Sequence, residues 1–364
     1  EKVFSLFIEN EFIQFAYGGG DVGAYLTRHE LVDSIHITGS ARTHDIIVFG
    51  PGEEGQKRKR DNQPVTTKPI SSELGGVSPT IVVPGPWSKG DFKFQAEHIA
   101  TQKLQNSGHN CIATQVLIMP EEWTGTERLL QEVENEIANA EKRPAYYPGS
   151  EDRQNAAREH ANAKCLDSGV DRTIIYDADS QIDEPCFRDE YFSPVLATIS
   201  IPGDNPSAFI QAAVQFANEK LVGTLGANII IDPKTARENK ADLDQAIADL
   251  KYGSIGVNTW CALAFLAAGG AWGAYPGHTY DNIQSGIGVV HNAFLFDKTE
   301  KTVATGPFRN FPRSLLHGEL HMAPRPPWFV SNKTAHTTAK RLTYFAEKEN
   351  ILALPGIFAS ALRG

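Results

Sequence analysis

The chain has 364 residues, of which 41% are hydrophobic and 21% charged, so it is long enough for two domains with full hydrophobic cores. The formal net charge of −10 disfavours nucleic acid and anionic membrane surfaces as partners, because a polyanion binds a positive field. No apolar run approaches the roughly 20 residues that a membrane span needs.

In chain order, the apolar spacing predicts a first strand in the Phe- and Ile-rich run 3–17 and a loop over residues 51–64. Helices are expected at 21–29, 92–105, 127–142, 153–164, 207–220 and 234–250. Strands are expected at 34–37, 114–119, 195–201, 227–231 and 254–258. From Asn310 onward, a Pro-, Arg- and aromatic-rich tail is expected to pack over the surface. Strands that alternate with helices favour an α/β fold with a largely parallel sheet.

The four cysteines, Cys111, Cys165, Cys186 and Cys261, are far apart and form no CxxC pair. This spacing disfavours a metal site or a disulfide framework and favours a reducing, cytoplasmic location. Cys111 follows Gly108 and amide side chains at an expected helix-to-strand corner, where a cysteine can be an exposed nucleophile. The alternative for Cys111 is a small buried hydrophobe.

Glu73 lies in the segment SSELGG, between an apolar run and a double glycine. A carboxylate held there near a cleft can serve as a general base, and the alternative is a solvent-facing turn acid. Glu190 and Phe192, in DEYFSPV, could hold a ribose and pack on a ring, or could be a surface acid and a core aromatic.

Two glycine-containing turns could hold a phosphate. The turn Thr38-Gly39-Ser40 precedes an expected helix, whose first amides bind anions, although Ser40 could equally be an ordinary N-cap. Gly18, Gly20 and Gly23 match the spacing of a dinucleotide fingerprint, which is a weak signal in a glycine run.

These segments together resemble the aldehyde dehydrogenase family. ITGS at 37–40, ELGG-x-SP at 73–79, N-x-G-x-x-C at 106–111 and EYFSPV at 190–195 occur in the order and approximate spacing of that family. The resemblance covers about residues 10–306. It implies an oxidoreductase that uses NAD or NADP to convert a small aldehyde to a carboxylic acid, through a thiohemiacetal and a thioester on the cysteine.

By resemblance, Cys111 matches the nucleophile and Glu73 the general base. The residues that match the family's cofactor contacts are Gly39 and Ser40 at the pyrophosphate, Leu74 through its carbonyl at the nicotinamide amide, Glu190 at the ribose and Phe192 beside the nicotinamide. The segment 258–265 matches the substrate mouth, and its apolar character suggests an uncharged aldehyde.

The resemblance also implies a domain plan. Residues 1–75 would be the C-terminal part of a Rossmann-like cofactor domain, 76–275 the α/β catalytic domain, 276–309 a return segment with an oligomerisation arm, and 310–364 an extension. We expect residues 294–307 to pair with a neighbouring subunit of a homodimer or higher homo-oligomer, because a strand without a sheet exposes unpaired backbone groups. The alternative is an internal edge strand.

Several positions depart from the family pattern. His44 and Ser193 replace usual glycines, the stretch 49–64 is longer than the family loop, and the tail from Asn310 runs past the family's usual end. The family's N-terminal portion has no counterpart before Tyr17, so we expect the natural polypeptide to begin earlier. Two other functions stay open: an inactive scaffold on the same fold, and a coenzyme A-acylating dehydrogenase, although Glu73 favours hydrolysis.

Overall fold

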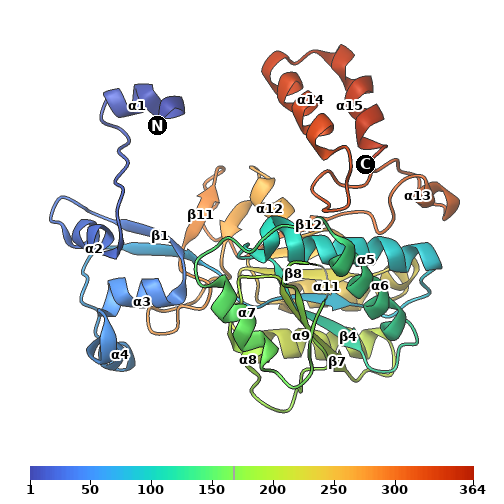
Figure 1. Cartoon of the computed structure of the whole chain (residues 1–364), viewed down its shortest axis with the longest axis horizontal. Helices are drawn as coiled ribbons and strands as arrows, with labels where there is room; N and C mark the ends of the chain where they lie inside the picture. Colours follow the sequence, from blue (N-terminus) through green and yellow to red (C-terminus); the bar gives the residue numbers. More distant parts are fainter. Residues whose placement is uncertain (167–168) are drawn as a thin grey trace.

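A mostly parallel sheet of short apolar strands forms the centre of the structure, a computed structural model that describes residues 1–166 and 169–364 (Figure 1). The strands are β1 Ile35–Gly39, β2 Ile70–Leu74, β3 Ser78–Val82, β4 Thr114–Pro120, β5 Ala163–Cys165, β6 Thr173–Ile175, β7 Val195–Ile201, β8 Gly226–Ile230, β9 Ser254–Val257, β10 Ala271–Gly273, β11 Val289–Asn292 and β12 Thr302–Thr305. Within the described residues the main sheet has the order β12-β9-β8-β3-β4-β7-β6-β5, and its β5–β6 pair is antiparallel. The predicted α/β class is confirmed.

Helices cover both faces of this sheet. The helices of the described residues, including those outside this main body, are α1 Ser5–Glu9, α2 Gly20–Arg28, α3 Ala41–Phe49, α4 Gly52–Arg60, α5 Lys89–Leu104, α6 Thr126–Asn139, α7 Ser150–Arg158, α8 Pro185–Arg188, α9 Pro206–Lys220, α10 Pro233–Glu238, α11 Lys240–Asp249, α12 Ala262–Leu266, α13 Arg313–Leu316, α14 Ala335–Lys348 and α15 Leu354–Ala361, with short 3-10 helices η1 Lys2–Phe4, η2 Gln105–Gly108 and η3 Ile351–Ala353. Most of the helices expected from spacing are present, with ends shifted by a few residues.

Strand β4 shows why the central strands are apolar throughout. Successive side chains of a strand point to opposite faces, and both faces are covered here. Leu117 and Met119 pack with α5 and α6, whereas Val116 and Ile118 pack on the other face with α9. The result is a three-layer body with one hydrophobic core on each side of the sheet.

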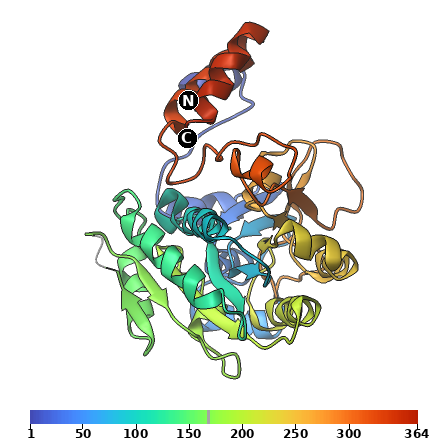
Figure 2. The ribbon, with the colours of Figure 1, turned by 90° about the vertical axis from the view of Figure 1, so that its right-hand side faces the viewer.

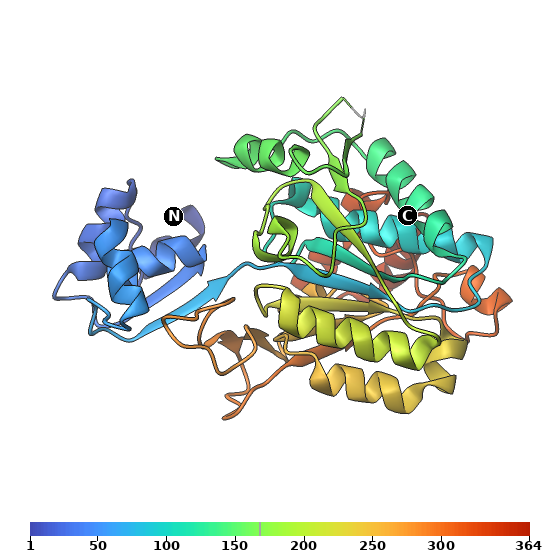
Figure 3. The ribbon, with the colours of Figure 1, turned by 90° about the horizontal axis from the view of Figure 1, so that it is seen from below.

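Residues 20–74 form a smaller unit beside the main body, and strand β2 leads from it toward β3 (Figure 3). In this unit β1 pairs in parallel with β2, and Val48 and Phe49 of α3 pack against Ile70. Backbone hydrogen bonds from Ser72 and Leu74 reach the carbonyls of residues 287 and 285, both at 2.8 Å. The segment 285–287 therefore holds β2 from its second side.

The C-terminal tail divides into two parts. Residues 308–331 run across the surface of the main body along α5, as predicted. Beyond them, the hairpin of α14 and α15 stands away from the sheet (Figure 2).

Three local predictions were wrong. Residues 3–17 contain η1 and α1 instead of a strand, because no strand in the described part of the chain pairs with this segment and a helix satisfies its backbone groups locally. Residues 51–64 contain α4 instead of a loop: Glu53 and Glu54 lie in its first turn and a basic run lies in its last, which complements the helix dipole. The expected helix 153–164 ends at Arg158, and β5 follows.

The premise behind the predicted subunit pairing, that residues 294–307 have no sheet of their own, was wrong for the second half of this segment. Strand β12 lies parallel to β9 of the same chain, with Thr302 opposite Ser254. Lys301 Nζ donates to the carbonyls of residues 247, 248 and 250 at 3.1, 2.6 and 2.8 Å and anchors the strand beside α11. Residues 302–305 thus form an internal edge strand, and whether the segment also contacts a neighbouring subunit stays a prediction. The oligomeric state stays a prediction.

Candidate active site

The loop before Cys111 has an unusual backbone. After α5, the residues Asn106, Ser107 and Gly108 have φ angles of 57°, 56° and 78°, in the left-handed region that non-glycine residues rarely adopt. A β-carbon at Gly108 would lie 2.5 Å from the Ser193 carbonyl, so only glycine fits. Holding a non-glycine residue in this region costs about 1–3 kcal/mol, so the packing around Asn106 and Ser107 must offset this cost.

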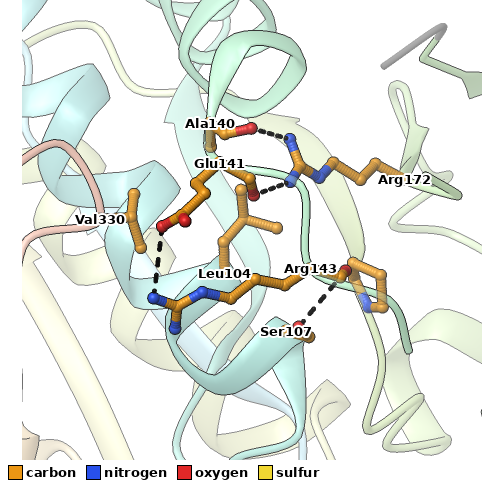
Figure 4. A pocket seen from close by; sticks show the side chains of 8 residues that line it. Leu104, Ser107, Ala140, Glu141, Arg143, Arg172 and Val330 are labelled. Atoms are coloured by element: carbon orange, nitrogen blue, oxygen red, sulfur yellow. Dashed lines mark hydrogen bonds and ion pairs between the residues drawn. The ribbon is translucent and has the colours of Figure 1, made fainter. Parts of the chain in front are cut away.

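A network behind this loop holds it in place (Figure 4). Arg172 donates to the carbonyls of Ala140 and Glu141 at 3.0 and 2.7 Å, beyond the end of α6, and Ser107 Oγ donates to the Arg143 carbonyl at 3.5 Å. The cavity between them has a volume of about 20 Å³. That is room for about one water molecule. This cavity is therefore a packing defect behind the loop and is too small to bind a substrate or cofactor.

Glu73 lies on β2 directly opposite Thr38 of β1. Its side chain is buried, and Oε1 accepts a hydrogen bond of 2.6 Å from the indole nitrogen of Trp272. The Thr38 hydroxyl donates to Oε2 at 3.4 Å. Two donors therefore fix the orientation of a carboxylate that the sequence alone could have placed in a solvent-facing turn.

A cavity of about 860 Å³ joins the small unit to the main body. It is lined by six of the seven residues predicted for catalysis and cofactor binding: Gly39, Ser40, Glu73, Cys111, Glu190 and Phe192. Leu74 is the exception. Its side chain is buried in the core, while its neighbours Glu73 and Gly75 line the cavity. The role of the Leu74 carbonyl stays a prediction.

The thiol of Cys111 is in its protonated form in this environment. Burial raises its pKa above the usual range, and the nearby carboxylates of Glu73 and Glu190 raise the pKa further. Its Sγ lies 3.9 Å from Oδ1 of Asn110, which also accepts from the backbone N–H of Ile112 at 3.1 Å. Reaction at Cys111 thus requires removal of a proton.

Glu190 is a second buried carboxyl group in the cavity. Burial raises its pKa to about 8, although the positive charges of Lys103 and Arg153 act in the opposite direction. Among the described residues, its Oε1 has no hydrogen-bond partner. A β-carbon on Gly75 would lie 1.9 Å from Glu190 Oε2, so the glycine leaves the room that this carboxyl occupies. An unpartnered buried oxygen of this kind is suited to a ligand hydroxyl.

The start of α3 faces the same cavity. Ser40 is its N-cap, with Oγ accepting a hydrogen bond from the backbone N–H of Thr43 at 3.2 Å. Ser40 is therefore an ordinary N-cap, as the alternative interpretation held, and it also lines the cavity. His44 does not line the cavity. Its side chain is buried, and its ring lies 6.0 Å from that of Tyr280. The His44 side chain is therefore directed into the packing of the small unit and not into the cavity.

The glycine run 18–23 has no fingerprint geometry. It leads into α2, follows no strand of the described residues, and does not line this cavity. Among the described residues there is also no helix that could cross a membrane and no cluster of three or more metal-ligating side chains.

Sequence reasoning missed several residues of the site. Arg153 donates through Nε to the carbonyl of Tyr191 at 2.6 Å, next to Phe192, whose ring meets Tyr147 at a centroid distance of 4.9 Å. Lys103 is fully buried and donates to the Val195 carbonyl at 2.7 Å. These side chains fix the loop that carries Glu190 and Phe192. Nothing in their local sequence signals this role, because the fold creates the contacts.

The fold and the site together define an α/β protein whose cleft joins a cysteine to two buried carboxyl groups. A sequence model described as the aldehyde dehydrogenase family matches residues 6–149, a range that contains Glu73 and Cys111. Among curated proteins, N-succinylglutamate 5-semialdehyde dehydrogenase 1 of Caulobacter vibrioides is 29% identical over 104 residues, which are 29% of this chain and 19% of that protein.

Solved structures show the same fold. The NADP complex of an NADP-dependent glyceraldehyde-3-phosphate dehydrogenase from Bacillus halodurans is similar, with a TM-score of 0.56, 20% identity, and coverage of 76% of this chain and 53% of that one. A betaine aldehyde dehydrogenase from Staphylococcus aureus in complex with NAD⁺ gives a TM-score of 0.58, 18% identity, and coverage of 79% and 55%. The chain has the aldehyde dehydrogenase fold, and the resemblance seen in its motifs is confirmed. It spans about half the length of these solved structures.

Proposed function

We propose that this chain carries the catalytic cysteine and base of an NAD- or NADP-dependent dehydrogenase that oxidises an aldehyde to a free carboxylic acid. One observation supports this most directly: Cys111, Glu73 and Glu190 come from separate segments of the sequence and line one cavity. A structural role would not require a thiol and two carboxyl groups to share a cleft, because burying ionisable groups is costly.

The residues around this cavity fit a dinucleotide. The N-terminal amides of α3, beside Gly39 and Ser40, suit a pyrophosphate. The unpartnered Oε1 of Glu190 suits a ribose hydroxyl, and Phe192 offers an aromatic side chain to a flat ring. When bound, the nicotinamide supplies the acceptor for the hydride that leaves the substrate carbon.

The first task of the protein is to deprotonate Cys111. Because burial and neighbouring carboxylates disfavour the thiolate, a base that takes the proton as the aldehyde arrives speeds this step, although a cysteine retains some thiolate without such help. Glu73 is a carboxylate that can assist this step, because it lines the same cavity as Cys111 and two donors hold its orientation. The thiolate then adds to the carbonyl carbon, and the backbone N–H of Cys111 can donate to the resulting oxyanion.

The second task is hydrolysis of the thioester that remains on Cys111 after oxidation. Glu73 takes a proton from a water molecule, the hydroxide adds to the thioester carbon, and the carbon–sulfur bond breaks to release the acid. A carboxylate in this position favours water over coenzyme A as the acyl acceptor, since a thiol acceptor does not need a water-activating base. Glu73 is therefore required for hydrolysis, whereas it only assists the earlier attack of Cys111.

Aldehyde-dependent NADH formation by the full-length polypeptide tests the proposal, measured with and without coenzyme A. We expect NADH and free acid without coenzyme A, and loss of both in the Cys111→Ala variant. Cys165→Ala is the matched control, because Cys165 is exposed and does not line the cleft. Parental activity in Cys111→Ala would show that the nucleophile is misassigned, and absolute dependence on coenzyme A would favour the acylating alternative.

A further inference from the structure

The histidine two positions before Cys111 closes the strained loop 106–111 on itself. The backbone N–H and the ring Nδ1 of His109 both meet the carbonyl of Asn106, at 3.0 and 3.1 Å, and Asn106 Nδ2 donates to the His109 carbonyl at 3.0 Å. Asn106 has one of the left-handed backbone conformations of this loop, which are costly unless other contacts hold them. The path of the chain into Cys111 thus depends on the ring of His109.

The second ring nitrogen of His109 is also hydrogen-bonded. Nε2 lies 3.1 Å from Oγ of Ser150, the first residue of α7, and Gln154 Nε2 donates to the same oxygen at 3.4 Å. A carbonyl oxygen only accepts, so Nδ1 carries the hydrogen toward Asn106, and Nε2 of the neutral ring accepts from the Ser150 hydroxyl. A second ring proton would turn Nε2 into a donor and reverse the bond with Ser150.

The surroundings of the ring disfavour its protonated form. The His109 side chain is buried, and burial lowers its pKa below the ordinary value of 6.5. The positive charges of Arg153 on α7 and Lys103 on α5 lower the pKa further, while the hydrogen bond to the Asn106 carbonyl acts in the opposite direction. The neutral ring is therefore the form that this site stabilises.

His109 also joins the loop of Cys111 to the aromatic side chain of Phe192. Its ring lies 5.7 Å from the rings of Phe192 and Tyr147 and 4.8 Å from that of Tyr146, measured between centroids. The side chains of His109, Cys111 and Phe192 line one cleft. A change at His109 therefore acts on both sides of the cleft at once.

Two other roles for His109 fit the geometry less well. Ser150 and His109 form a Ser–His pair, but Ser150 is buried and does not line the cleft, so a ligand there does not reach its hydroxyl. His109 is also not placed as a base for Cys111, because its two ring nitrogens are directed at Asn106 and Ser150. What remains is a side chain that acts through the loop that it holds.

We propose that His109 is a positioning residue for Cys111: its neutral ring holds the loop 106–111 against Phe192, and protonation of the ring loosens this hold. The inference rests on the proposed function, because the nucleophile that His109 positions is the one assigned there. Misplacing a reacting atom by about 1 Å can cost about 10²-fold in rate, so a ring two positions from the nucleophile can control turnover.

Two substitutions in the full-length polypeptide separate the hydrogen bonds of His109 from its charge. His109→Phe keeps a flat ring and removes both ring hydrogen bonds, whereas His109→Gln keeps a donor and an acceptor but does not titrate. His336→Gln, at an exposed position of α14, is the matched control. We measure kcat for aldehyde oxidation between about pH 5 and 8, and the rate at which iodoacetamide alkylates each cysteine at neutral pH.

The pH profile reports the charge of the ring. The kcat of the parent should fall on the acid side with a midpoint below 6.5, because protonation of His109 reverses the bond with Ser150. His109→Gln should retain most of the rate at neutral pH and lose this acid limb. His109→Phe should lower kcat by about tenfold or more at every pH, and His336→Gln should match the parent.

Alkylation reports the position of the loop without any need for aldehyde oxidation. In His109→Phe, iodoacetamide should modify Cys111 about tenfold faster or more, because the released loop exposes a thiol that the parent keeps largely covered. The buried thiols of Cys186 and Cys261 should stay protected, which distinguishes a local release from general unfolding. His109→Gln should lie close to the parent.

An acid limb that persists in His109→Gln, or parental alkylation of Cys111 in a folded His109→Phe, would overturn the positioning role. Faster alkylation of Cys186 and Cys261 in both His109 variants would also contradict it, since the loss would then be general. If the parent oxidises no aldehyde, the proposed function fails, and the alkylation of Cys111 alone decides whether His109 holds the loop.

Discussion

Replacing Glu73 with Gln should separate the two chemical steps. The buried carboxylate accepts from Trp272 at 2.6 Å and from Thr38 at 3.4 Å, and the amide oxygen of glutamine can keep the shorter of these bonds, so the fold should survive. The amide cannot take a proton from water. Because general-base catalysis contributes about 10²–10⁴-fold, hydrolysis of the thioester should slow by at least about a hundredfold.

Rapid-mixing measurement of NADH should then show a burst close to one equivalent per active site, followed by a slow steady state. Hydroxylamine, which attacks a thioester without a general base, should partly restore turnover. The absence of both burst and rescue would show that Glu73 acts mainly on Cys111, and steady turnover at the parental rate would show that it is no base at all.

Three further changes test the environment of the site. Trp272→Phe removes one hydrogen bond to the Glu73 carboxylate, which is worth about 1.5–3 kcal/mol. The steady-state rate should therefore fall about tenfold or more, while cofactor affinity measured by calorimetry stays unchanged. An unchanged rate would mean that this bond does not position Glu73. The Glu190 carboxyl is protonated below its pKa of about 8 and becomes a better acceptor for ribose hydroxyls above that pH, so cofactor affinity should rise as pH increases through about 8. Glu190→Gln should remove this pH dependence. A parental affinity that does not change with pH would contradict the role of Glu190 at the ribose. Hydrogen bonds from Arg309, Ser88 and Arg313 outweigh burial and lower the pKa of Asp91 to about 2, so its stabilisation is present above the unfolded value of 3.8 and is lost as pH falls toward 2. Asp91→Asn should cost about 3–5 kcal/mol in urea unfolding at neutral pH and flatten the acid limb, and equal stability of variant and parent would contradict the role of this anchor.

The cavity-lining residues to which we assign the chemistry could be identified from the sequence because they lie in short motifs. Cys111 and Glu73 occur in segments whose residue types and order are specific, and the structure brings both to one cleft. The same holds for Gly39, Ser40 and Glu190. Parallel strands bring the ends of distant segments to one edge of a sheet, so a correct α/β prediction already implies that such motifs converge.

The residues that support the site could not be predicted, because their partners are distant in sequence. Trp272 is 199 positions from Glu73, and Arg309 is 218 positions from Asp91. An isolated Trp or Arg carries no signal of its partner. Lys103 reads as a surface residue of a helix, and only the packed structure shows it buried against the loop that follows Glu190.

The failed predictions have two origins. Residues 3–17 have the composition of a strand but no neighbour to pair with, and the expected loop 51–64 contains a helix that ion pairs stabilise, including Arg58 with Glu54 at 3.2 Å. Strand β12 pairs in parallel with β9 of the same chain. For residues 3–17 and for β12, the partner or its absence decided the outcome, and local composition does not contain that information; α4 instead depends on a local charge pattern that the loop prediction did not weigh.

The central claim is that Cys111 becomes covalently acylated during aldehyde oxidation. Acid quenching of the Glu73→Gln variant during the burst, followed by peptide mass spectrometry, tests it directly, because the slow hydrolysis should leave the thioester in place. The account predicts an acyl group on the peptide that contains Cys111, formed only when aldehyde and cofactor are both present. An acyl group on Cys165, Cys186 or Cys261, or NADH formation with no acylated cysteine, would contradict it.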